Sequence, residues 1–255
     1  MSKEPAPIYP AYAFKESPTW FTWVKLLAVD VHGLREEAGF QGQNVYFYQN
    51  HPIRFVCLTG LVVSIDDKLN RYTLLELDDG SGSLIVVKIT RLDSASAASP
   101  SSSFSSNTNV ANVDVVVAPG RYDVLVNRVP LSIGAAVKVK CTISEFRNVR
   151  QLELKRIWTL RSTAEEAAEW EECARFKREV LCRPWVVSKE KLRALLSAET
   201  EKRMRLEDRE RREDRRQKRA TARKMESAEK RREHEQRKEE RRKREEDRMN
   251  KGAIV

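Results

Sequence analysis

The chain is poor in the residues that most often build metal sites and disulfide frameworks. Its 255 residues include three histidines and four cysteines, and no two cysteines show C-x-x-C spacing. Cys57 and Cys141 lie within alternating apolar segments, a pattern typical of small core residues. We therefore expect no metal site and no cofactor, and we expect the chain to work in a reducing compartment.

Long apolar runs and catalytic constellations are also missing from the sequence. No stretch has the length and apolar character of a membrane span, and the N-terminus lacks a secretory signal pattern. Asp66–Asp67 and Asp78–Asp79 fall at the ends of predicted strands, where aspartates are turn residues. Because no membrane span is predicted, we expect no membrane contact. Because the sequence shows neither a nucleophile–base pair nor a metal-ligand set, we expect no enzymatic activity.

The formal charge of +10 is unevenly distributed along the chain. Residues 199–255 hold 23 Lys/Arg and 16 Asp/Glu, a surplus of 7, whereas residues 1–198 hold 25 and 22, a surplus of 3. The first part is thus almost neutral, and a nucleic-acid site within it has to be a local patch.

Strict alternation of apolar and polar residues is the main structural signal. Residues 137–154, with the sequence VKVKCTISEFRNVRQLEL, read as two strands joined by a polar turn. Matching segments lie upstream at residues 53–66, 71–78 and 83–91, the last two joined by a DDGSG turn. Gly60 within the first long strand predicts a bulge or a sharp bend, as small barrels need at their corners. The pattern predicts a small β-barrel with a basic outer surface.

Composition divides the chain into four segments. An aromatic-rich arm over residues 1–50 is expected to pack on the barrel, which spans residues 51–161. A Ser/Ala/Asn-rich stretch at residues 93–113 reads as a flexible insertion. A helix is predicted within residues 162–187, with Thr163 and Glu166 as its capping box, and residues 188–255 form a charged tail, helical or disordered.

Two features of the C-terminal segments allow more than one reading. The predicted helix and the segment after it carry an apolar stripe, which either packs on the barrel or binds a partner subunit: Trp170, Cys173, Phe176, Val180, Leu181 and Trp185. The tail contains RRQKRATARK, which is a nucleic-acid arm, a nuclear-import signal or simply a solvated charge run.

Several outward-facing residues of the predicted barrel suit the binding of a single-stranded nucleic acid. Tyr72 can stack on a base, and cations around it can contact phosphates. The candidate set is Arg71, Tyr72, Lys88, Lys138 and Lys140, with Arg147 and Arg150 in the last hairpin turn. Leu74, Leu84 and Val86 also point outward, which favours a protein cover over part of this surface.

Four residue strings together resemble one known family. These are NVYFYQNHPIRFVCLTGLVVSID, LELDDGSG, VKVKCTISEFRNVRQLELKRI and REVLCRPWVVS. They resemble the fungal Stn-type subunit of the telomeric CST complex, which is related to the middle subunit of replication protein A. The resemblance covers roughly residues 8–190 and implies a mainly β fold, an OB-fold (a five-stranded Greek-key barrel) followed by a C-terminal helix.

The resemblance also implies a function. It predicts a nuclear, chromosomal telomere-capping subunit that forms a heterodimer with a small Ten-type OB-fold protein and joins a large telomere-binding subunit. It further implies contact with single-stranded telomeric DNA. It also implies contact with DNA polymerase alpha–primase, through which the subunit would coordinate lagging-strand fill-in. Some members carry winged-helix domains, for which residues 188–255 lack the mixed core composition. The alternative is a general single-stranded-DNA-binding subunit of a replication protein A-like complex.

Overall fold

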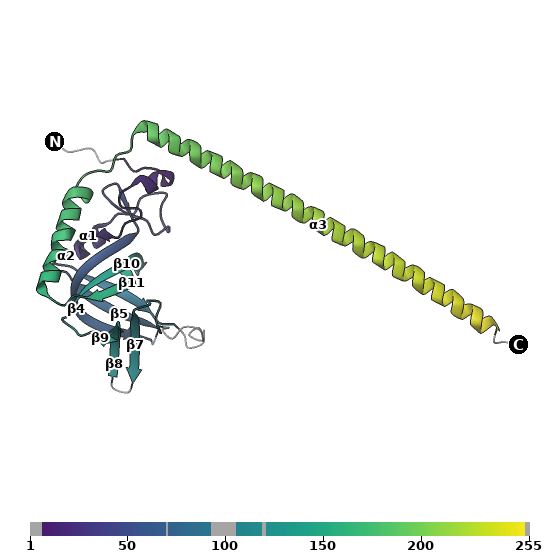
Figure 1. The fold of residues 1–255 in the computed structure, drawn as a ribbon, viewed down its shortest axis with the longest axis horizontal. Helices are drawn as coiled ribbons and strands as arrows, with labels where there is room; N and C mark the ends of the chain where they lie inside the picture. Colours follow the sequence, from purple (N-terminus) through teal and green to yellow (C-terminus); the bar gives the residue numbers. More distant parts are fainter. Residues whose placement is uncertain (1–6, 70, 93–105, 119–120, 253–255) are drawn as a thin grey trace. The chain divides into compact units, whose positions relative to one another are not determined.

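The chain divides into two units, Met1–Lys189 and Glu190–Val255. The computed structural model describes residues 7–69, 71–92, 106–118 and 121–252 (Figure 1). The first unit contains every strand of the described chain, and the second is part of a single long helix, α3 (Lys189–Gly252). Among the described residues, no helix has the length and apolar character needed to cross a membrane.

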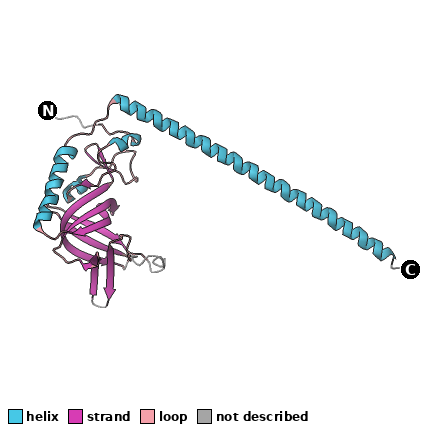
Figure 2. Cartoon of the chain, in the orientation of Figure 1, coloured by secondary structure: helices cyan, strands magenta, loops and turns pink. Residues whose placement is uncertain are grey.

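Five strands form a closed barrel in the first unit (Figure 2). They are β4 (Phe55–Lys68), β5 (Tyr72–Asp78), β6 (Leu84–Thr90), β10 (Ala136–Phe146) and β11 (Val149–Thr159). The sheet runs in the order β4–β10–β11–β6–β5, and β4 pairs with β5 to close it. The β11–β6 pair is parallel, and the β4–β5, β5–β6 and β10–β11 pairs are antiparallel. This is the predicted OB-fold barrel.

Alternation along the strands fills the barrel as the sequence predicted. On β5 and β6 the side chains that point inward are almost completely buried: Thr73, Leu75, Leu77, Ile85, Val87 and Ile89. Val137, Val139, Cys141 and Ile143 of β10 face the same core, together with Leu152, Leu154 and Ile157 of β11. Each large apolar side chain buried in this way contributes about 1.5–3 kcal/mol to folding. The core thus fixes which residues face outward.

Strand β4 contributes to both halves of the barrel, and Gly60 lies where these halves meet. Its first half pairs with β10 and its second half with β5, and the register shifts between Val62 and Ser64. The irregularity therefore lies two residues beyond Gly60. At Gly60 the reason for glycine is close approach, because a Cβ there would lie 2.7 Å from the carbonyl oxygen of Asp78.

The N-terminal arm packs on the barrel through a series of short elements. These are η1 (Ala11–Glu16), β1 (Val24–Lys25), α1 (Ala28–Gly33), β2 (Tyr46–Tyr48) and β3 (His51–Ile53). The aromatic rings of Phe14, Phe40 and Phe47 lie 5.1–5.9 Å apart, and β1 extends the sheet beside β4. The predicted first strand, residues 53–66, is therefore divided, with β3 ending before β4 begins.

The segment between β6 and β10 carries a small sheet of its own. It consists of β7 (Val113–Ala118), β8 (Arg121–Val126) and β9 (Val129–Pro130). Of the predicted flexible insertion, residues 93–105 lie outside the described residues. The remainder is ordered, because Val110 is buried and the Thr108 hydroxyl donates to the carbonyl of Val113.

After the barrel come α2 (Thr163–Phe176) and a π-helical turn, η2 (Lys177–Leu181). The helix is capped one residue earlier than the sequence predicted, because the Ser162 hydroxyl accepts from the Glu165 amide at 3.2 Å. Glu165 in turn accepts from the Arg161 amide at 2.9 Å. Ser162 and Glu165 have the spacing of a capping box, so the choice of Thr163 and Glu166 was wrong.

Asn50 and His51 hold the segment after η2 against the arm. The Asn50 side chain donates to the Trp185 carbonyl at 2.7 Å and accepts from the Trp185 amide at 3.0 Å. His51 Nε2 lies 2.8 Å from the Arg183 carbonyl, so the neutral ring donates there. Burial lowers the pKa of His51 below its usual range, and the bond to Arg183 offsets only part of that effect.

We predict that Gly60→Ala destabilises the barrel. The added methyl group meets the backbone of Asp78 rather than a flexible side chain, so strands β4 and β5 have to separate locally. The expected loss is about 1–3 kcal/mol in the free energy of unfolding, measured by urea denaturation. Gly33→Ala at the end of α1 is the matched control, since no atom lies within 4 Å of its Cβ position. Equal stability of the two variants would contradict the close-approach argument.

We predict that His51 makes the fold acid-sensitive. Because its pKa is lower in the folded than in the unfolded chain, the unfolded chain takes up the proton first as the pH falls. Stability is therefore lost as the pH drops below about 6.5, the pKa of an unperturbed histidine. Urea denaturation at pH 7.5 and 5.5 measures this loss, which should shrink in His51→Gln and persist in His234→Gln on the exposed surface of α3. An unchanged loss in His51→Gln would refute the assignment.

Candidate nucleic-acid and partner interfaces

The outer face of β5 and β6 brings Tyr72 together with two cations. The Lys88 ammonium lies 5.5 Å from the Tyr72 ring centroid, and the Arg71 guanidinium lies 5.9 Å from it. Both distances are within the range of cation–π attraction. Arg71, Tyr72 and Lys88 therefore form one cluster, as the sequence predicted for residues near the start of β5 and on the facing strand.

Glu153 of β11 limits the free charge of this cluster. Its carboxylate lies 2.8 Å from the Lys88 ammonium. The hydrogen bond from Lys88 lowers the pKa of Glu153 more than partial burial raises it, so the carboxylate is ionised at neutral pH. A phosphate at Lys88 thus has to compete with Glu153, whereas Arg71 is exposed and has no ion pair within the described chain.

The turn between β10 and β11 places a second aromatic–cation pair at the other end of this face. Arg147 and Asn148 have positive φ values of 52° and 62°, which two-residue hairpin turns require. Phe146 before the turn is 60% exposed, and the Arg147 guanidinium lies 5.2 Å from its ring centroid. Arg147 was predicted from the sequence as a nucleic-acid-binding residue, but Phe146 was not. Phe146 is the one aromatic residue in the polar stretch SEFRN, which could have indicated it.

Arg150, the second predicted cation of this hairpin, has a different role. Its guanidinium donates to the carbonyls of Val31 and His32 at the end of α1 and lies 5.3 Å from the Tyr46 ring centroid. The side chain is partly buried by these contacts. Arg150 therefore attaches α1 to the barrel and is not available to clamp a passing strand.

Lys138 and Lys140 lie on β10 opposite Thr59 and Cys57 in the first half of β4, whereas Tyr72 lies opposite Lys68 at the far end of β4. The Lys138 ammonium lies 2.6 Å from Glu169 of α2. Lys140 lies 5.5 Å from the ring centroid of Trp23 and 5.4 Å from that of Trp158. Neither lysine joins the Tyr72 cluster, so the single basic patch predicted from alternation is divided by the fold.

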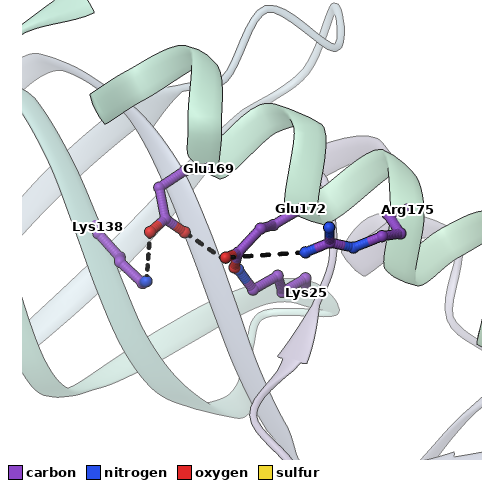
Figure 3. Close-up of polar contacts among 5 residues, drawn as sticks. All are labelled: Lys25, Lys138, Glu169, Glu172 and Arg175. Atoms are coloured by element: carbon purple, nitrogen blue, oxygen red, sulfur yellow. Dashed lines mark hydrogen bonds and ion pairs between the residues drawn. The ribbon is translucent and has the colours of Figure 1, made fainter. Parts of the chain in front are cut away.

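An ion-pair cluster attaches α2 to the barrel (Figure 3). Glu169 bridges Lys138 and Lys25, and Glu172 pairs with Lys25 and lies 4.0 Å from Arg175. Burial raises the pKa of Glu169, but the hydrogen bonds from Lys138 and Lys25 outweigh it and hold the pKa below its usual range. The two lysines come from β10 and β1, so the helix is linked to two separate parts of the chain.

Most of the predicted apolar stripe of α2 and η2 packs on the protein itself. Leu181 is buried in the core, Phe176 is partly buried against it, and Trp185 is buried with its ring 4.8 Å from that of Tyr9. Cys173 lines a small cavity between α2 and β4, and burial raises the pKa of its thiol to about 11. Val180 is half-buried.

Trp170 differs from the rest of the stripe because it is 48% exposed. It lines the same small cavity as Cys173, but about half of its surface remains open to a partner. Of the six residues of the predicted interface, Trp170 is the one with an exposed side chain, and the interface itself stays a prediction.

Neither a metal-binding group nor a disulfide is seen in the described part of the chain. Its described residues contain no group of three or more His, Cys, Asp or Glu side chains placed to hold a metal ion. The four cysteines are free thiols. The described surface does present aromatic rings beside cations, together with the half-exposed Trp170.

Comparisons with known proteins agree with this fold. The family model described as "Telomere regulation protein Stn1" matches residues 38–115, which include β2–β6 and the Tyr72 cluster. A bovine protein named CST complex subunit STN1 is 27% identical over 148 residues, covering 56% of this chain and 37% of the relative. The mouse protein of that name is 24% identical over 135 residues, covering 53% and 34%.

A solved structure titled "Crystal structure of yeast Stn1 and Ten1" matches with a TM-score of 0.52 at 16% identity, covering 75% of this chain and 91% of that chain. This likeness establishes the fold. The matched region spans about a third of the length of the curated mammalian relatives. In sequence and fold the chain is thus similar to Stn-type CST subunits, in line with the resemblance of its residue strings.

Proposed function

We propose that this chain is a non-catalytic telomere end-protection subunit that contributes to binding single-stranded telomeric DNA. The observation that carries the proposal is an OB-fold barrel with aromatic–cation pairs at both ends of its β5–β6 face. OB-folds bind oligonucleotides across this face and between the flanking loops. The similarity to the Stn1 family and to CST subunits supports a location at chromosome ends, within the nucleus.

Each end of the face has a defined part in the proposed mode of binding. Tyr72 and Phe146 offer ring faces to bases, while Arg71 and Arg147 contact the adjacent phosphates. Lys88 exchanges Glu153 for a phosphate when a strand binds. Leu74, Val86 and Leu84 lie between the two ends, and they provide an apolar floor for stacked bases or for a neighbouring protein.

The proposed partner is a small Ten-type OB-fold protein. Its support is the solved yeast pair of Stn1 and Ten1, together with the exposed ring of Trp170 on α2. Large aromatic anchors often dominate interfaces of this kind. The resulting heterodimer joins a large telomere-binding subunit and coordinates lagging-strand fill-in with DNA polymerase alpha–primase.

We predict that Tyr72→Ala and Phe146→Ala each weaken binding of a G-rich single-stranded telomeric oligonucleotide. Losing one stacked base costs about 1–3 kcal/mol, which corresponds to roughly 5- to 150-fold in Kd. Fluorescence anisotropy with the full chain in its heterodimer measures the change. Phe21→Ala is the control, because Phe21 is an exposed aromatic of the N-terminal arm, 74% accessible, and outside this face. Unchanged affinity in both test variants would exclude the β5–β6 face.

We predict that Trp170→Ala abolishes co-purification with a Ten-type subunit. The change removes the exposed anchor and leaves Leu181 in the core and Phe176 against it, so the barrel stays folded by circular dichroism. Phe21→Ala, which removes an equally exposed ring elsewhere, should retain the partner. If folded Trp170→Ala still forms the one-to-one complex, α2 is not the interface.

A further inference from the structure

The positive charge of α3 is concentrated in one short segment. Residues 215–224 hold six Lys/Arg and no Asp/Glu, a net charge of +6. The 26 residues before them in the helix, 189–214, hold nine basic and eight acidic residues, a net charge of +1. The 28 residues after them, 225–252, hold eleven and nine, a net charge of +2. The long helix is therefore almost neutral apart from this basic segment.

Five arginines around this segment lie on one face of the helix. They follow the spacing i, i+3, i+4, i+7 and i+11, and they line a shallow surface depression: Arg212, Arg215, Arg216, Arg219 and Arg223. At 100° per residue this spacing keeps them on one side, over about 16 Å of helix at 1.5 Å per residue. We call this surface the arginine face. All five side chains are exposed.

The arginine face lacks the ion pairs found elsewhere on α3. Before it, Arg203, Arg205 and Arg209 pair with glutamates one turn away. After it, Arg241 and Lys243 do the same. Within the described residues, no acidic side chain pairs with any of the five arginines of the face. Five like charges within three turns repel one another, so a bound polyanion stabilises this segment.

The residues of the arginine face indicate which class of polyanion it can bind. Ala220 is the one apolar residue that lines it, so the face lacks the apolar side chains that an interfacial membrane helix inserts. It also lacks the apolar seam by which a second helix would pair with it. Guanidinium groups instead match phosphate oxygens in a two-pronged geometry, and a row of them follows a repeating phosphate backbone.

We propose that the arginine face of α3 is a nucleic-acid-binding surface, separate from the barrel, that contacts the phosphate backbone without reading sequence. It goes beyond the proposed function, since no barrel residue takes part in it. Phosphate contacts release counterions, so affinity contributed by the face falls steeply with salt. Linked to a base-stacking barrel in one chain, such a surface raises the overall affinity for a strand long enough to reach both.

The test compares two quadruple variants of the full chain. The first variant carries Arg215→Gln, Arg216→Gln, Arg219→Gln and Arg223→Gln, which remove four charges from the arginine face. The control variant carries Arg203→Gln, Arg205→Gln, Arg209→Gln and Arg241→Gln, which remove from the same helix four charges that each pair with a glutamate one turn away. Glutamine is nearly as good a helix former as arginine, and circular dichroism at 222 nm confirms that both helices persist. The probe is a mixed-sequence 30-nucleotide single-stranded DNA, titrated by anisotropy between 50 and 200 mM NaCl.

The arginine-face variant should lose at least about tenfold in affinity at 100 mM NaCl. The slope of log K against log salt should become shallower by up to about 3, since each phosphate contact to a single strand contributes roughly 0.7. The control variant should change less than about twofold on the same counterion argument, because acidic neighbours already neutralise its arginines. Equal effects in the two variants, or no effect in the first, would overturn the proposal.

A barrel variant keeps this outcome separate from that of the proposed function. Tyr72→Ala removes a stacking ring and no charge, so it should weaken binding and leave the salt slope unchanged. If Tyr72→Ala has no effect while the arginine-face variant does, the arginine face stands and the barrel site fails. If the reverse holds, the barrel site stands and the arginine face fails.

Discussion

Closure of the barrel depends on the double pairing of β4, which holds β10 along its first half and β5 along its second. That arrangement brings β4 and the Asp78 backbone so close at Gly60 that no Cβ fits between them. The two candidate surfaces of the first unit follow from this closure. It sets β5 and β6 side by side with Tyr72 and Lys88 outward, and it places β10 with Lys138 where α2 can cover it. A barrel that opened at Gly60 would lose the shape of both surfaces.

Cations are distributed around the first unit according to what lies beside them. Lys25 and Lys138 neutralise Glu169, and Arg150 binds the end of α1, so these charges stabilise the fold. Lys140 lies between two tryptophan rings. Arg71 and Arg147 are exposed beside aromatic rings. The first unit holds 23 Lys/Arg and 21 Asp/Glu, a surplus of only two charges, yet it still has exposed positive sites, and α3 adds a concentrated basic segment.

Alternation predicted the barrel well because burial of one strand face is a local property of the sequence. The inward positions of β5, β6 and β10 were all correct. The same reasoning gave the outward positions but not their neighbours. Judged from its own strand, Lys138 was expected to be unpaired. In the structure it pairs with Glu169, which lies 31 residues further along the chain. Arg150 and its acceptor His32 are 118 residues apart. Contacts between such distant residues leave no periodic signal, so the predicted basic patch combined residues that the fold separates.

The sequence by itself determined which side chains of the barrel strands face the core, and where charge concentrates in the C-terminal segment, which it left as helical or disordered. These features follow from side-chain periodicity and local composition, which act over a few residues. Only the tertiary structure decided which outward side chains remain available. It attached most of the α2 stripe to the barrel, left Trp170 half exposed and placed Phe146 beside Arg147 at the hairpin turn. Availability depends on partners brought in from distant parts of the chain, and barrel closure chooses those partners.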